Sequence, residues 1–182
     1  MVALETGDWV SPLGGLQELA QWGGSTTFGP DTNEVYVLPW LADVSFAVSA
    51  VLVDVGTTGV GTGEFAPVIY EDNDGAPGSL LWSGLVDVTT TRETKTVSDV
   101  DVAITAGRIY WFGGFSSSPV WMNILGVPRL SVFWPFAMSF PDMPPAYVNS
   151  IRTAGGVTDP PDPFGPWAAS QTISPRLYLQ AA

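Results

Sequence analysis

Residues 68–82 read VIYEDNDGAPGSLLW, in which an apolar run leads into an acidic segment and then into a second apolar run. The middle segment, residues 71–78, contains three carboxylates, two glycines and a proline. Asp, Asn, Gly and Pro are the residue types that build turns between strands. The pattern therefore predicts two strands joined by a turn-rich loop at residues 71–78.

Further apolar segments continue this pattern along the chain, with glycine-rich or polar breaks between them. Apolar and polar residues alternate most clearly at residues 44–50 and 97–104, which predicts strands with one buried and one exposed face. No long amphipathic helix interrupts the series, so we expect an all-β fold, an antiparallel β-sandwich of the jelly-roll type. The predicted strands are residues 35–40, 44–55, 65–70, 80–88, 94–104, 108–115 and 173–179.

The predicted sandwich occupies residues 33–182, after an extended or anchoring N-terminal segment at residues 1–32. A short helix is a candidate at residues 16–22, which two glycines follow. Residues 116–150 are dense in proline and aromatic residues and are expected to form a long insertion without central strands. Residues 158–167 are expected to be a stiff, extended, Pro-rich linker to the final strand.

Composition excludes several classes of function. The net charge is -12 with only six Lys and Arg residues, so we expect no nucleic-acid partner, because phosphate binding needs clustered bases. The chain has no cysteine and no histidine, which excludes disulfides, thiolate sites, His-ligated zinc and Ser-His-Asp hydrolysis. The longest weakly charged stretch, residues 44–53, is too short to span a bilayer, so no membrane insertion is expected.

Two parts of the sequence together resemble a known family. The tyrosine-ended strand, acidic loop and Leu80-Leu81 strand are one part, and residues 104–112, ITAGRIYWF, are the other. Virion proteins of tailed bacteriophages, of the minor tail, tail-fibre and head-decoration type, have a similar order of segments. Their domains also often finish in a Pro-Arg-hydrophobic strand, here residues 175–179. The resemblance covers residues 33–179.

The resemblance implies a non-catalytic structural protein on the exterior of a phage tail or capsid. Its partners would be other virion proteins and further copies of the same chain, with a homotrimer as the expected oligomer. No cofactor is implied. Residues 1–16 contain no basic residue, so we expect no secretory signal and production in the host cytoplasm before incorporation into the virion.

A carbohydrate-binding module for a host surface glycan is the alternative function. The chain contains eight tryptophans, and indole faces stack on the apolar faces of sugars. Trp121, Phe133 and Trp134, in the insertion, are the candidate contacts for a glycan or a protein partner. The opposing interpretation is that aromatic residues fill a core or an interface. Strands are expected to hold Trp40, Trp82 and Trp111, and non-sheet segments Trp9, Trp22, Trp121, Trp134 and Trp167.

The carboxylates leave two further alternatives. Glycoside hydrolysis needs only a pair of acidic residues, and the candidates are Glu34, Glu64, Glu71 and Glu93. The sequence gives no distances between these residues, so we assign no catalytic residue. Calcium binding at residues 71–75 requires suitable spacing, but aligning Gly75 with the invariant glycine of an EF-hand loop puts Tyr70 and Leu81 where carboxylates are required. We therefore assign no metal site and interpret the acidic residues as a turn.

Overall fold

The structure of the chain is a computed structural model, which describes residues 4–10, 25–28, 33–55, 63–88, 93–116, 122–125, 150–154, 156–170 and 177–182. Every regular element within these ranges is a β-strand, as the sequence predicts. The strands are β1 (Trp9–Val10), β2 (Ser25–Phe28), β3 (Glu34–Leu41), β4 (Phe46–Val55), β5 (Gly63–Asn73), β6 (Ala76–Ser83), β7 (Val86–Val88), β8 (Glu93–Ile104), β9 (Ile109–Ser116), β10 (Met122–Leu125), β11 (Ser150–Thr153), β12 (Trp167–Ser170) and β13 (Leu177–Ala181).

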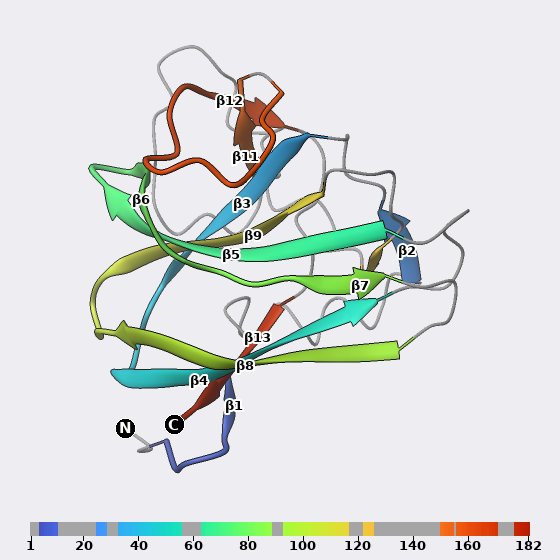
Figure 1. Ribbon diagram of the computed structural model, residues 1–182. Coiled ribbons are helices and arrows are strands. Elements are labelled where there is room, and N and C mark those ends of the chain that lie inside the picture. Colours follow the sequence, from blue (N-terminus) through green and yellow to red (C-terminus); the bar gives the residue numbers. More distant parts are fainter. Residues whose placement is uncertain are drawn as a thin grey trace.

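The strands form two main antiparallel sheets that face each other (Figure 1). The smaller sheet has the order β1-β13-β4-β8, and the larger has the order β12-β11-β3-β9-β5-β6, with β7 also paired to β5. The chain crosses between the sheets from β3 to β4, from β4 to β5, from β7 to β8, from β8 to β9 and from β12 to β13, whereas β5, β6 and β7 stay in one sheet. This order is the topology of a jelly roll, so the predicted antiparallel sandwich is confirmed.

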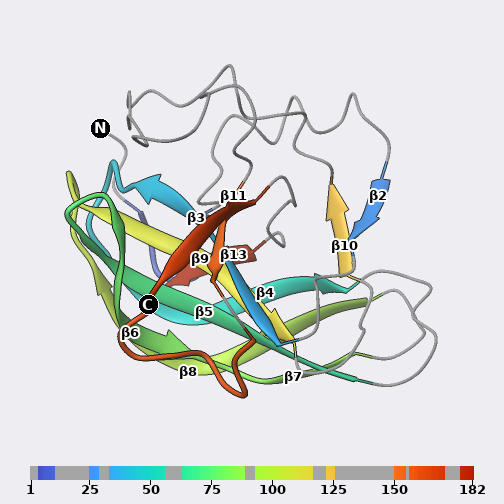
Figure 2. The same ribbon diagram turned by 90° about the horizontal axis from the view of Figure 1, so that it is seen from above.

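Five strands extend or flank this framework. β11 and β12 continue the larger sheet beyond β3 (Figure 1). β2 and β10 pair with each other (Figure 2) and join part of the N-terminal segment to part of the insertion. β1, also from the N-terminal segment, is an edge strand of the smaller sheet against β13. The helix candidate at residues 16–22 lies outside the described residues.

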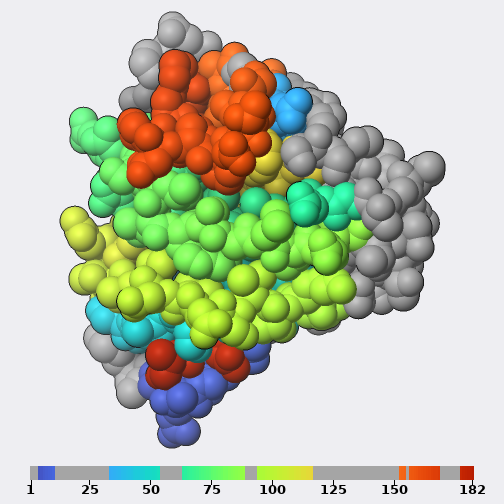
Figure 3. Space-filling model, viewed as in Figure 1, coloured from blue at the N-terminus to red at the C-terminus, as the bar shows by residue number. Residues whose placement is uncertain are grey.

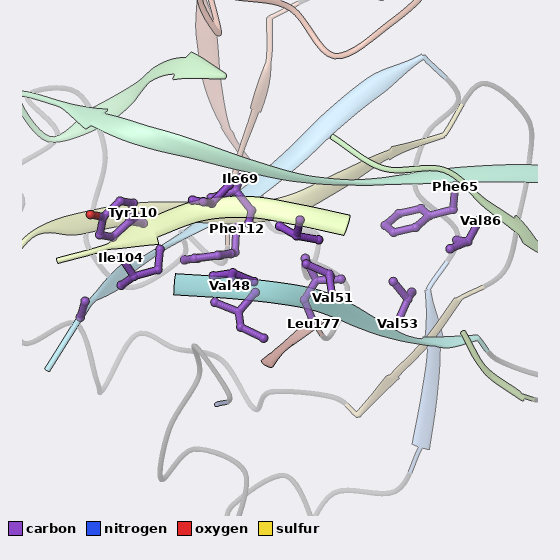
Figure 4. Close-up of a cluster of buried hydrophobic side chains, with 14 of the residues drawn as sticks. Val48, Val51, Val53, Phe65, Ile69, Val86, Ile104, Tyr110, Phe112 and Leu177 are labelled. Carbon is purple, nitrogen blue, oxygen red and sulfur yellow. The ribbon is translucent and has the colours of Figure 1, made fainter. Parts of the chain in front are cut away.

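The inner core fills the space between the two sheets. The smaller sheet contributes mainly valines, such as Val48, Val51 and Val53, and the larger sheet contributes Ile69 and Phe112 (Figure 4). In β8, Val100, Val102 and Ile104 are buried while Asp99 and Asp101 are exposed, so the predicted alternation is confirmed there. Burial of these apolar side chains is the main stabilising contribution to such a fold.

A second core lies on the outer face of the larger sheet. Val35, Val37, Val68 and Trp111 are all fully buried there. Phe164, from the Pro-rich segment, packs into the same cluster. We call residues 156–166 the strap; its segment is seen in orange against the green β5 and β6 in Figure 3. The predicted linker is therefore a segment that covers a sheet, and the larger sheet is buried on both faces where the strap lies.

Several strand boundaries differ from the prediction. The predicted strand at residues 80–88 is divided into β6 and β7 by Gly84 and Leu85. Gly84 donates its N–H to the carbonyl of Pro67 at 3.0 Å, and a side chain on it would meet the ring of Trp82, 2.6 Å from the position of its Cβ. The break lies opposite Pro67, inside β5. The N and O of a strand residue point to the same side, so Pro67 accepts the N–H of Gly84 but has no N–H to donate to the strand on that side. The final strand, β13, continues to Ala181, two residues beyond its predicted end, while its predicted start at residues 173–176 lies outside the described residues.

Candidate functional site

The acidic segment forms a tight hairpin and not the loop predicted at residues 71–78. β5 and β6 stay paired up to Asn73 and Ala76, so only Asp74 and Gly75 turn the chain. Their φ angles are 53° and 87°, as a type I′ turn requires, and Asp-Gly is a favoured pair for that turn. Asp72 Oδ2 accepts the N–H of Gly75 at 3.0 Å. A two-residue turn is possible here because Asp74 and Gly75 adopt the left-handed conformation at little cost.

Asp72 also connects the hairpin to β9. The indole N–H of Trp111 donates to Asp72 Oδ1 at 2.8 Å, and the ring of Trp111 is fully buried. Tyr70 and Glu71 pair with Trp111 and Tyr110 in the sheet. Both oxygens of Asp72 therefore hold protein groups in place, so this carboxylate has a structural role.

The strap is fastened next to this hairpin. The hydroxyl of Tyr70 donates to the carbonyl of Pro161 at 3.0 Å, and the N–H of Leu80 donates to Asp162 Oδ1 at 3.0 Å. The N–H of Phe164 donates to the carbonyl of Gly78 at 2.9 Å. Burial raises the pKa of Tyr70, and the negative charge of Asp162 raises it further, so the hydroxyl stays protonated as this donor bond requires.

A groove opens at the end of the sandwich where the hairpin meets the turn between β8 and β9. Its volume is about 390 Å³, near the lower end of the range for small-molecule pockets. β5, β6, β8, β9 and the turn all contribute to its walls, so both sheets border it. The lining residues are Glu71, Asp72, Leu81, Ala103, Gly107, Arg108, Ile109 and Tyr110.

Two opposite charges in the groove are not engaged with each other. Within the part of the chain that the structure describes, the side chains of Glu71 and Arg108 make no hydrogen bond or ion pair. The other polar side chains of the groove are occupied: Asp72 holds Trp111 and Gly75, and the hydroxyl of Tyr110 accepts the N–H of Thr105 at 2.9 Å. Glu71 and Arg108 are therefore the two groups that this groove offers to a ligand.

The sequence-based candidates lie elsewhere. Trp121, Phe133 and Trp134 are outside the described residues. Trp9 and Trp167 were expected in non-sheet segments, but they are exposed on the edge strands β1 and β12. Sequence reasoning missed Arg108 as a site residue, although its position directly after Gly107, which has a φ of 81°, marked a tight turn beside the Tyr-Trp strand.

The acidic candidates for hydrolysis are spread over three strands, with Glu34 on β3, Glu64 and Glu71 on β5 and Glu93 on β8. Glu34 is an ion-pair partner of Arg152 and accepts the hydroxyl of Tyr36 at 2.7 Å. Glu64 and Glu71 lie near opposite ends of β5, roughly 20 Å apart at the usual rise of a strand. Among the described residues, no three acidic side chains lie together in a way that would hold a metal ion.

No helix in the described ranges is long and apolar enough to cross a bilayer. Comparison of the chain with protein-family models, with curated proteins and with solved structures gave no match. Its function is therefore inferred from its own residues and geometry.

Proposed function

We propose that the chain is a non-catalytic structural protein of a tailed-bacteriophage virion, on the outside of the tail or the capsid. It acts there as a minor tail, fibre or decoration protein, through assembly contacts and attachment to the host surface. The hydrogen bond between Trp111 and Asp72 carries the proposal, because it joins the two separate segments on which the family resemblance rests. The acidic hairpin and the Tyr-Trp strand thus form one structural unit.

The separation of Glu64 from Glu71 and the contacts of Glu34 favour binding over catalysis. A glycosidase needs two carboxyl groups about 5–10 Å apart across a substrate. Glu64 and Glu71 are separated along β5, and Glu34 is engaged by Arg152 and Tyr36. The groove itself contains one available carboxylate, that of Glu71, and one guanidinium, that of Arg108.

Exposed apolar side chains supply surfaces for assembly. Leu85 is 58% exposed at the break between β6 and β7, and Leu81 is 38% exposed on β6, at one edge of the larger sheet. Trp9 and Trp167 are exposed on other edge strands. Edge strands with apolar side chains are suited to contacts with further copies or with other virion proteins. We expect a homotrimer, which mass photometry of the purified protein would test.

The virion role is tested on particles. Mass spectrometry of purified particles should detect the chain in a fixed ratio to the major capsid or tail protein, and cryo-electron microscopy should place a jelly-roll domain on their exterior. Absence of the chain from particles would contradict the proposal. A deletion mutant separates the two activities: loss of assembly contacts damages particle stability, whereas loss of attachment leaves intact particles that fail to adsorb to the host.

A further inference from the structure

The groove between the hairpin and the β8–β9 turn has the composition of a ligand site. Glu71 comes from β5 and Arg108 directly precedes β9, and these strands pair so that Glu71 lies opposite Tyr110. The groove therefore receives one carboxylate and one guanidinium from neighbouring strands. The backbone positions of both residues are fixed, since strand pairing holds Glu71 and the turn bond from Arg108 N to Thr105 O at 3.2 Å holds Arg108.

The unengaged charges define what the groove can bind. A carboxylate accepts hydrogen bonds and a guanidinium donates them, whereas a hydroxyl group does both. A ligand with several neighbouring hydroxyls can thus donate to Glu71 and accept from Arg108 at the same time. Hydrogen bonds to charged groups make a larger net contribution than those between neutral groups, so each contact with Glu71 or Arg108 adds to the affinity for such a ligand.

The remaining lining is apolar. Leu81 and Ile109 contribute aliphatic surface, and Leu81 is 38% exposed at the groove. A sugar ring presents hydroxyls at its rim and C–H groups on its faces, so it matches a site with polar ends and an aliphatic wall. The volume of about 390 Å³ suits one sugar unit or a disaccharide and not a long buried chain.

We propose that this groove is a carbohydrate-binding site, in which Glu71 and Arg108 hold the hydroxyls of a neutral sugar and Leu81 and Ile109 contact its apolar face. The site is separate from the aromatic candidates of the insertion. It names the ligand class for the attachment part of the proposed function and rests on that function for its biological setting. Binding itself is measured on the purified protein, so the two proposals can fail independently.

The test is a titration of the full chain, labelled with nitrogen-15, with the methyl glycosides of glucose, galactose, rhamnose and N-acetylglucosamine. At least one glycoside should shift the amide resonances of Glu71, Gly107, Arg108 and Ile109. Glu71→Ala and Arg108→Ala should each weaken this binding roughly tenfold or more, which corresponds to loss of a charge-assisted hydrogen bond. Asp101→Ala, which removes an exposed carboxylate from β8, should bind as the unaltered protein does.

Three outcomes would overturn the proposal. The first is that no glycoside shifts the groove amides. The second is that shifts map elsewhere or that both groove variants bind as well as the Asp101→Ala control. The third is that glycine, used as a small zwitterion, binds the groove while none of the sugars does. If a glycoside binds the groove but the chain is absent from particles, only the virion role fails.

Discussion

The ring of Phe164 packs edge to face against the ring of Tyr70, with 5.1 Å between their centroids and an angle of 85° between their planes. Aromatic pairs favour this geometry because the positive edge of one ring faces the negative face of the other. Phe164 is nearly fully buried, so the strap contributes a side chain to the outer core and does not merely cross it. The second core of the larger sheet therefore depends on a segment far along the sequence.

Truncation of Phe164 tests this dependence. Phe164→Ala should lower the free energy of unfolding by about 3–5 kcal/mol, the usual cost of removing a buried aromatic side chain. Phe164→Leu should cost less, because it keeps much of the buried apolar volume. Urea denaturation followed by fluorescence would measure both values.

The matched control is Leu85→Ala, since Leu85 is a large apolar residue that is 58% exposed. It should change stability by less than about 1 kcal/mol. Equal effects of Phe164→Ala and Leu85→Ala would mean that the strap does not stabilise the outer face.

Tyr70 makes the stability dependent on alkaline pH. Its pKa is raised by burial and by the charge of Asp162, so the folded state holds this proton more tightly than the unfolded chain does. The stabilisation is therefore complete below the unfolded pKa of about 10 and is lost as the pH rises above it. We expect the free energy of unfolding to fall more steeply above pH 10 in the unaltered protein than in Tyr70→Phe.

The same variant has an effect near neutral pH. Tyr70→Phe removes the hydrogen bond to the carbonyl of Pro161 and should cost about 1 kcal/mol. Denaturation curves measured from neutral to alkaline pH give both quantities. Parallel pH profiles for the two proteins would show that Tyr70 ionises as easily in the folded state as in the unfolded chain.

Local sequence patterns were sufficient to predict most strands of the two main sheets, but not the short strands β1, β2, β10, β11 and β12, nor what covers the sheets. Alternation in β8 correctly identified its buried and exposed faces, because the face on which a residue lies follows from its position within that one strand. In β5, all residues from Phe65 to Tyr70 are buried, and the reason is the strap, which no local pattern links to β5. The hairpin was predicted too long because Asp72 and Asn73 resemble loop residues but continue β5.

The groove was not predictable for a related reason. Glu71 and Arg108 line one site because β5 pairs with β9 in a particular register, and local sequence patterns do not reveal the pairing of strands that are far apart in the chain. Aromatic residues in the insertion were predicted as ligand contacts because the ability of their rings to stack on sugars follows from residue type alone. That Glu71 and Arg108 line the same groove follows only from the pairing of β5 with β9.

Asp72 should matter more for stability than its place in an acidic run suggests. Asp72→Ala removes the acceptor of the buried indole N–H of Trp111 and the bond that closes the turn, so it should cost about 2–3 kcal/mol. Asp74→Asn is the control, because asparagine also tolerates the left-handed conformation of that position. Chemical denaturation would compare them, and equal stability of the two variants would contradict a structural role for Asp72.

Gly114 should be intolerant of a side chain, because the ring of Phe65 occupies the space where one would lie. A Cβ on Gly114 would lie 1.9 Å from Cζ of Phe65 and 2.4 Å from its Cε2. Phe65 is fully buried in the inner core, so its ring cannot move without displacing neighbours. Gly114→Ala should therefore lower the free energy of unfolding by about 3 kcal/mol, at the upper end of overpacking costs.

A double-mutant cycle separates this contact from any general cost of removing a glycine. Phe65→Leu removes the ring atoms that would clash, so Gly114→Ala should be less costly in that background, with an interaction energy of about 1–2 kcal/mol. Gly156→Ala is the control for the substitution itself, since the nearest atom to its Cβ position is 3.8 Å away. Additive effects of Phe65→Leu and Gly114→Ala in denaturation experiments would show that the ring and the glycine do not share this space.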